Sequence, residues 1–406
     1  MKIVRSKILQ GDKIIWSVYI LFIFISIVEV FSSMGKEVAS GSFVPMLRRH
    51  CLWLLIGFIC CFIAHKSDYR KLSKYLNILL GVSLTLICIP YFAALVKNEP
   101  LSLARWIKIP FPLMNLQFQP SEIAKYVMIF YISSVMASNQ PKIDSKEIFW
   151  RLMIPLGLVC GIVFWSNFST TVLIFATCFL LMRIGGVNKK YLYLTLAVLI
   201  VVFGLMLLMA YLSPDVAHRV GRLGTIVSRT EGHSATDISQ ITQSNQALMA
   251  VATGGLLGRG IGNSIQSSFL EEGHNDFIFS IILEEGGIWL GGFIILLYII
   301  LLYRMFKTAK SVNGYFGAMA CCGMGIVITL QALINMSVAV GLIPVTGQTL
   351  PFISYGGTSF VFASIFLGVV INISKRAEEG TAKEENLQEI TPEENDTAFD
   401  ENKTPD

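Results

Sequence analysis

The chain has 406 residues, of which 54% are hydrophobic and only 15% are charged. Soluble globular proteins carry about 25% charged residues, so this composition excludes an ordinary soluble domain and indicates a membrane protein with several spans. The formal net charge of +5 does not indicate a nucleic-acid partner, and we expect none, because the basic residues are concentrated in alternate loops.

Long apolar runs predict the fold class, which is an all-α integral membrane protein with about ten transmembrane helices. The runs lie near residues 14–34, 50–65, 75–96, 121–137, 152–166, 169–185, 191–212, 276–303, 315–341 and 359–374. The first run follows several basic residues, as a signal peptide does. It is too long for that role and no convincing cleavage site follows, so we predict an uncleaved first helix.

The eight cysteines all fall inside these apolar runs and none forms a CxxC pair. This pattern is typical of small buried residues. We therefore predict neither a disulfide nor a zinc site.

Basic residues alternate between the loops and so predict the orientation of the chain. Lysine and arginine are concentrated near residues 2–13, 66–74, 142–151, 183–190, 304–310 and 375–376. By the positive-inside rule, both termini are cytoplasmic and the loops at 97–120, 213–275 and 342–358 face outward. Residues 1–376 then form the membrane domain, with its large outward loop at 213–275 between helices 7 and 8. Residues 377–406 are acidic and predict a disordered cytoplasmic tail.

The second outward loop, at 104–126, ends in a good helix start, because Pro120 precedes Ser121 and Glu122. Glu122 and Lys125 are three residues apart and share a helix face. They could form an internal salt bridge that neutralises both charges at the membrane edge. Alternatively, Lys125 and Arg105 could supply positive charge to a phosphorylated head group.

The large outward loop holds Arg222 and Gln243 as candidates for substrate binding. Residues of an ordinary solvated loop would show the same pattern. Five glycines between 254 and 262 do not form a dinucleotide fingerprint, because no buried strand precedes them. We expect these glycines to allow tight turns near lipid or substrate.

The stretch 273–287 combines a polar junction with the start of an apolar run. His274, Asn275 and Asp276 lie at the junction, and Glu284 and Glu285 follow inside the run. Ionisable groups at this depth cost free energy and are functional candidates. Structural alternatives remain open, because Asn275 and Asp276 could cap the helix, His274 could be an interface donor, and the glutamates could pair with neighbouring helices.

The last outward loop, at 341–360, is rich in glycine and proline, which forbid a regular helix there. Irregular backbone at membrane depth is tolerated only where it is buried in protein or lines a polar cavity. All the unusual polar sequence therefore lies on one side, where a site would work at the outer leaflet.

Three stretches resemble the SEDS family (shape, elongation, division and sporulation proteins), of the FtsW/RodA type. They are RWI…QPSEIAK, NQALMAVATGGLLGRGIGNS…LEEGHNDFIF…LEEGG and PVTGQTLPFISYGGTS. The sequence of the third stretch is closer to the division type, FtsW. The resemblance implies a peptidoglycan glycosyltransferase in the bacterial cytoplasmic membrane, which polymerises lipid II at the outer leaflet together with a class B penicillin-binding protein and other divisome proteins.

The resemblance also implies roles for individual residues. The family's essential aspartate falls on Asp276, its glutamate and lysine on Glu122 and Lys125, and its arginine on Arg105. With the loop residues, the substrate-binding candidates are Arg105, Glu122, Lys125, Arg222, Gln243 and His274. The chain departs from the family's usual PDxGT motif, because Asn167 stands where an acidic residue is usual. A role of that acid in metal binding is therefore in doubt here.

The implied reaction joins the 4-hydroxyl of one lipid-linked disaccharide to the anomeric carbon of another and releases a lipid diphosphate. It needs a base, for which Asp276 is the candidate, and positive charge for the leaving group. That charge would come from the basic candidates or from a divalent cation (Mg²⁺ or Mn²⁺). No protein-held metal is predicted. Two alternatives stay open: a flippase for lipid II, and a non-catalytic scaffold of the division machinery.

Overall fold

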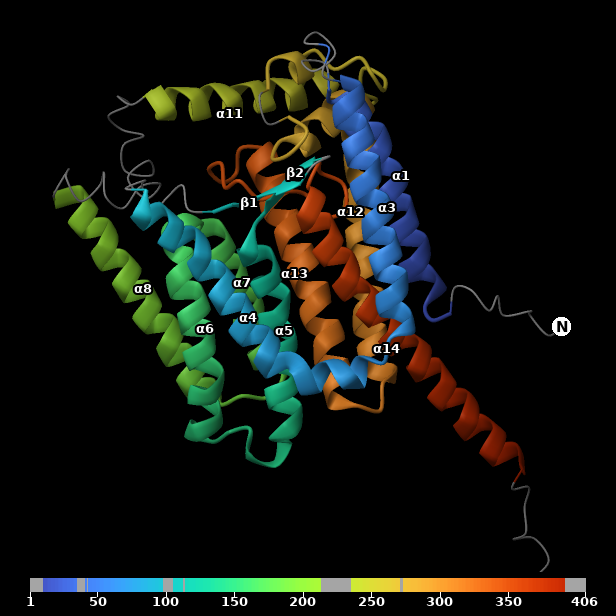
Figure 1. Cartoon of the computed structure of the whole chain (residues 1–406). Helices are drawn as coiled ribbons and strands as arrows, with labels where there is room; N and C mark the ends of the chain where they lie inside the picture. The colour runs from blue at the N-terminus through green and yellow to red at the C-terminus, as the bar shows by residue number, and fades with distance from the viewer. Residues whose placement is uncertain are drawn as a thin grey trace, which may run out of the picture.

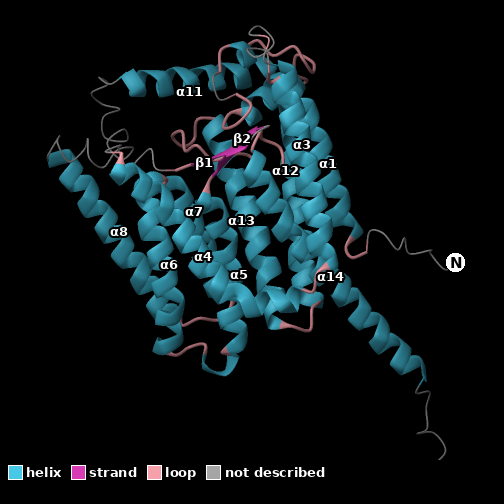
Figure 2. Cartoon of the chain, viewed as in Figure 1, coloured by secondary structure: helices cyan, strands magenta, loops and turns pink. Residues whose placement is uncertain are grey.

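Long apolar helices run side by side in a bundle, and one shorter helix lies across its end (Figures 1 and 2). This arrangement is seen in a computed structural model that describes residues 10–34, 41, 43–97, 105–111, 114–212, 235–270 and 273–390. The helices of the bundle are α1 (Lys13–Ser32), α3 (Phe43–Lys66), α4 (Tyr69–Val96), α5 (Pro120–Ser138), α6 (Lys146–Ser166), α7 (Phe168–Ile184), α8 (Lys189–Leu212), α12 (Ile278–Ser311), α13 (Tyr315–Ala339) and α14 (Gly357–Ile390).

Each apolar run of the sequence coincides with one of these helices. Within the described part of the chain, seven helices are long and apolar enough to cross a membrane: α1, α3, α4, α6, α12, α13 and the first 24 residues of α14. Helix α7 is apolar but shorter. The predicted fold class, an all-α multi-pass membrane protein, is confirmed.

Three segments differ from the sequence prediction. The outward loop 213–275 contains helix α11 (Ala235–Gly254), and the loop 97–120 contains an antiparallel hairpin of β1 (Ile107–Phe111) and β2 (Met114–Phe118). Helix α14 continues to Ile390, into the segment predicted as a disordered tail. Residues 377–390 are mostly good helix formers, and Lys375 pairs with Glu379 one turn later. Residues 391–406 lie outside the described part.

Helix α11 was not predicted because its apolar residues form only a short run, at 247–252. Ala247 and Ala250 are buried, and Ala247 belongs to a small apolar cluster with Phe277 and Ile281 at the start of α12. The helix therefore lies across the end of the bundle, above the start of α12 (Figure 1).

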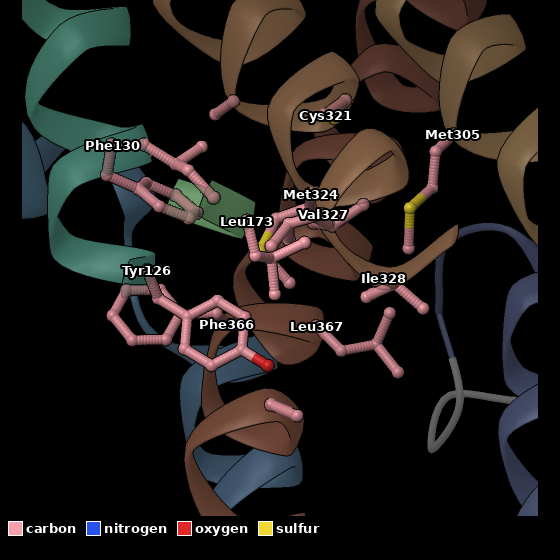
Figure 3. Close-up of a cluster of buried hydrophobic side chains, with 14 of the residues drawn as sticks. Tyr126, Phe130, Leu173, Met305, Cys321, Met324, Val327, Ile328, Phe366 and Leu367 are labelled. Atoms are coloured by element: carbon pink, nitrogen blue, oxygen red, sulfur yellow. The ribbon is translucent and has the colours of Figure 1, made fainter. Parts of the chain in front are cut away.

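Part of the core of the bundle lies between α5, α7, α13 and α14. Aromatic rings of α5 pack against α14, with centroids 5.1 Å apart for Tyr126 and Phe366 and 5.0 Å apart for Phe130 and Phe366. Figure 3 shows these rings beside aliphatic side chains of α7 and α13. This packing fixes the neighbouring polar ends of α5, α13 and α14, where the candidate site is built.

Ion pairs join the helices at the end of the bundle away from α11. The Arg304 guanidinium lies 2.6 Å from the Asp12 carboxylate, and Asp12 N–H donates to Ser374 Oγ at 2.9 Å. Arg376 pairs with Asp68 at 3.1 Å. The start of α1 and the later part of α14 therefore lie at the same end, opposite the end that holds α11 and the hairpin (Figure 1).

Candidate functional site

The candidate base, Asp276, lies in a turn at residues 273–277 that leads into α12. Helix α12 begins at Ile278, so Phe277 occupies the N-cap position, and it makes no side-chain capping hydrogen bond. The N-cap position is therefore one residue after Asp276 rather than at Asn275 or Asp276. Asp276 is half-buried, which leaves its carboxylate partly accessible at this end of the bundle.

Three consecutive carbonyl groups of this turn accept hydrogen bonds from distant parts of the chain. The donors are Tyr355 N–H to His274 O (2.9 Å), Ser354 Oγ to Asn275 O (2.7 Å) and Asn335 Nδ2 to Asp276 O (2.8 Å). Because all three bonds end on backbone oxygens, they fix the position of the turn without using the carboxylate of Asp276. The turn is thereby held against α13 and the loop at 341–356.

The donors are themselves fixed by further hydrogen bonds. Asn335 Nδ2 also donates to Gln348 O at 2.8 Å, and Leu350 N–H donates to Ser354 Oγ at 2.7 Å. The loop that carries these groups has irregular backbone, yet Leu350–Ser354 is buried, and Phe352 adopts a positive φ of 65° there. Of the two alternatives left open, burial in protein and the lining of a polar cavity, the structure shows burial in protein for residues 350–354, and the strained φ shows that packing overrides local preference.

The same loop is tied to α7, where the sequence departs from the family pattern. Gln348 Nε2 donates to Thr170 Oγ1 at 2.9 Å. Asn167 is the N-cap of α7, and its Oδ1 accepts from Thr170 N–H at 3.2 Å. Asn167 thus has a structural role here, since asparagine is among the best capping residues.

Glu122 and Lys125 form a buried ion pair on α5. Lys125 Nζ lies 2.9 Å from Glu122 Oε2 and 2.7 Å from Gln331 Oε1, and Ser359 Oγ donates to the same glutamate oxygen at 2.8 Å. Lys125 has no exposed surface. Of the two alternatives, the structure shows the internal salt bridge, in which the ammonium is already neutralised and hydrogen-bonded.

Glu284 and Glu285 organise the glycine-rich loop at 255–268. Glu284 Oε2 accepts from Ser264 Oγ at 2.5 Å, and Glu284 Oε1 accepts from Ile265 N–H at 3.1 Å. Glu285 Oε1 accepts from Ser32 Oγ of α1 at 2.5 Å. Both carboxylates are buried, so they are structural groups that hold the loop and α1 to α12.

The glycines of that loop let its backbone approach α12. At Gly258, φ is +75°, and a Cβ would lie 2.1 Å from the carbonyl oxygen of Glu285. Helix α12 is interrupted at Gly287, where φ is +65°, and the exposed backbone groups pair with the loop, as in Ile288 N–H to Gly255 O at 3.1 Å. The predicted tight turns are present. At Gly258 the turn lets the backbone of the loop lie directly against α12.

Sequence reasoning missed a second group of residues beside the Asp276 turn. The Tyr355 ring contacts the His274 ring edge-on at 5.5 Å and the His50 ring at 5.4 Å. Ser26 Oγ lies 3.0 Å from His50 Nε2 and donates to Ile353 O, so it ties α1 and α3 to the loop. His50 was missed because it lies inside an apolar run.

The guanidinium of Arg49 lies beside the phenol of Tyr355. Burial raises the pKa of Tyr355 above its ordinary value, and the nearby Arg49 opposes that rise. The phenol is therefore protonated near neutral pH and can donate one further hydrogen bond. The doublet Arg48–Arg49 was not among the sequence candidates, although its position before the second apolar run could have drawn attention to it.

The remaining candidates are placed as follows. Arg105 interacts electrostatically with Tyr91 of α4, and it is half-buried. Gln243 lies on α11 one turn before Ala247, hence on the face toward the start of α12. Arg222 lies outside the described residues. In the described part of the chain, no three metal-ligating side chains come together.

The long apolar helices and the clamped polar turn define a multi-pass membrane protein with an internal polar site at one end. The FtsW/RodA/SpoVE family model, described as "Cell cycle protein", matches residues 12–379. The chain therefore belongs to this family, as the resemblance implied.

Individual relatives agree with this assignment. The probable peptidoglycan glycosyltransferase FtsW of Coxiella burnetii is 31% identical over 341 residues, covering 81% of this chain and 86% of that protein. Stage V sporulation protein E of Bacillus subtilis is 33% identical over 338 residues, again covering 81% and 86%. A chain from a structure described as "Structural coordination of polymerization and crosslinking by a peptidoglycan synthase complex" shares the fold, with a TM-score of 0.68 at 22% identity over 90% of this chain and 98% of that chain.

Proposed function

We propose that this protein is a peptidoglycan glycosyltransferase that polymerises lipid II at the outer leaflet of the cytoplasmic membrane during cell division. The observation that carries the proposal is the Asp276 turn, in which three consecutive backbone carbonyls accept hydrogen bonds from α13 and the last loop and Asp276 is half-buried. Hydrogen bonds to the backbone of the turn hold the candidate base in position. Several relatives are named peptidoglycan glycosyltransferases, which supports the reaction type.

In the proposed reaction, the Asp276 carboxylate accepts the proton of the 4-hydroxyl of the acceptor disaccharide. The hydroxyl oxygen forms a bond to the anomeric carbon of the donor, and the bond from that carbon to the diphosphate oxygen breaks. The electron pair of the broken bond stays on the lipid diphosphate, whose negative charge needs positive partners in the site. A divalent cation, if used, would be brought by the diphosphate itself.

The distribution of buried charge argues against a flippase. In the described part of the chain, the buried acidic, basic and histidine side chains are Asp12, Glu29, His50, His65, Glu122, Lys125, Glu284 and Glu285. Asp12 and His65 lie where α1 begins and α3 ends, and the others lie toward the end that holds Asp276. No buried charge of the described chain lies between, whereas membrane transporters place their binding sites near the midplane.

The proposed partner is a class B penicillin-binding protein, which would crosslink the strands made here. A solved structure with this fold comes from a peptidoglycan synthase complex that coordinates polymerisation with crosslinking, and this supports the proposal. Other division proteins and membrane lipid complete the expected partners. We also propose that both termini are cytoplasmic, so that the Asp276 end faces outward.

The experiment that tests the function is polymerisation of purified lipid II by the purified protein, alone and with its cognate transpeptidase. We expect glycan strands from the protein or from the complex. Absence of polymer in both reactions would instead favour the flippase or the scaffold.

A further inference from the structure

We propose that Arg49 is the cation that binds the leaving lipid diphosphate, and that Tyr355 holds it in place. The inference rests on the proposed function and assigns a residue that sequence reasoning had left outside the site. Arg49 lies in the second turn of α3, is exposed, and places its guanidinium beside the Tyr355 phenol. It is therefore both open to a ligand and tethered to the site.

Tyr355 connects Arg49 to the candidate base through two direct contacts. Its N–H donates to His274 O at 2.9 Å, and its ring packs on the His274 ring at 5.5 Å. Asp276 follows His274 by two residues, which span at most about 7 Å. The donor diphosphate at Arg49 and the acceptor hydroxyl at Asp276 would therefore meet beside Tyr355 and His274.

On α3, contacts of His50 hold the Tyr355 ring in place. The ring contacts His50, which is buried and joined through Ser26 to the backbone of Ile353. Arg49 is the chain neighbour of His50, so the backbone that carries the guanidinium is fixed by the same contacts. A preorganised charge of this kind stabilises developing negative charge better than a mobile one.

The basic residues predicted from the sequence are less suited to this role. The Lys125 ammonium is buried and already bonded to Glu122 and Gln331, so a diphosphate would have to displace both partners. Arg105 lies beside Tyr91 of α4. The guanidinium of Arg49 is planar and can bind two phosphate oxygens at once, which a lysine cannot do.

The test uses full-length protein in nanodiscs with Arg49→Ala, Arg49→Gln, Tyr355→Phe and, as a matched control, Arg48→Ala. Arg49→Gln keeps an N–H donor for Tyr355 and loses only the charge. Two quantities are measured: the rate of lipid II polymerisation and the Kd for a polyprenyl diphosphate, with the uncharged polyprenol as a reference ligand. Because both arginines are exposed, all variants are expected to insert normally.

We expect both Arg49 variants to lose about 100-fold or more in kcat, the range seen when one charge-stabilising donor is removed. Their Kd for the diphosphate should rise about tenfold or more with no change for the polyprenol. Tyr355→Phe should show a smaller loss, and Arg48→Ala less than about fivefold, as for an exposed charge.

Two outcomes separate this inference from the function on which it rests. If the wild type polymerises lipid II and both Arg49 variants match it in rate and in diphosphate affinity, the assignment of Arg49 is overturned and the function stands. If the wild type makes no polymer but binds the diphosphate in an Arg49-dependent way, the binding site stands and the proposed reaction fails.

Discussion

Replacement of Lys125 by methionine tests whether the buried pair on α5 is structural. The change removes the ammonium but nearly keeps the side-chain volume. It leaves the buried Glu122 carboxylate with a single hydroxyl donor, Ser359, and takes away the donor to Gln331 Oε1. Breaking a buried ion pair in this way costs about 3–5 kcal/mol, whereas replacing both partners by neutral groups is often neutral. We therefore expect Lys125→Met to be strongly destabilised and the double variant with Glu122→Gln to recover most of the loss.

The assay is thermal unfolding of the purified proteins in detergent, with polymerisation measured on the same samples. An unchanged melting temperature for Lys125→Met would refute the structural role. A double variant that is stable but makes no polymer would show that this pair takes part in the reaction. Exchanging the two charges is a poorer test, because Gln331 Nε2 is committed to Thr349 O and its Oε1 would face a carboxylate at position 125.

The remaining predictions concern the orientation of the chain, the glycine-rich loop, and the clamp, meaning the three hydrogen bonds to the backbone carbonyls of the Asp276 turn. Cysteine labelling from outside the cell membrane should reach a probe at Ser239 and miss one at Thr391; the reverse pattern would overturn the orientation of the site. Gly258→Ala should lower the melting temperature well below that of Gly262→Ala, because both positions have positive φ but only at Gly258 would the new Cβ collide with α12. Equal losses would show that the close approach is unimportant. Ser354→Ala removes the bond to Asn275 O and the acceptor for Leu350 N–H, so kcat should fall while the affinity for lipid II changes little; unchanged turnover would show that the clamp does not position the base.

Local patterns were sufficient for the helices and for one polar pair. Apolar runs predict helices because the backbone N–H and C=O groups of each span must be hydrogen-bonded within the span itself. The i,i+3 spacing of Glu122 and Lys125 predicted their pairing, which the structure confirms. Helix α11 was not predicted because a helix that lies across the bundle need not have a long apolar run.

The organisation of the site could not be predicted because it depends on residues far apart in the sequence. Asn335 lies 59 residues from Asp276, and Ser354 lies 79 residues from Asn275. No local period relates such positions, since the bundle alone brings them together. The contact of Arg49 with Tyr355 is hidden in the same way, because an arginine at the start of a span is usually evidence for topology only.

Asp276→Asn is the substitution that isolates the central claim. The carboxamide has nearly the shape of the carboxylate, and the three hydrogen bonds of the clamp end on backbone oxygens that the substitution does not alter. Insertion, stability and association with the transpeptidase should therefore be unchanged. An amide cannot accept a proton usefully near neutral pH, so the proton of the acceptor hydroxyl would have no acceptor at this position.

The direct measurement is the amount of glycan polymer formed from purified lipid II by wild-type protein and by Asp276→Asn, each alone and with the transpeptidase. The proposed mechanism predicts polymer from the wild type and none from the variant, at equal amounts of inserted protein. Substantial polymer from Asp276→Asn would contradict the assignment of Asp276 as the base.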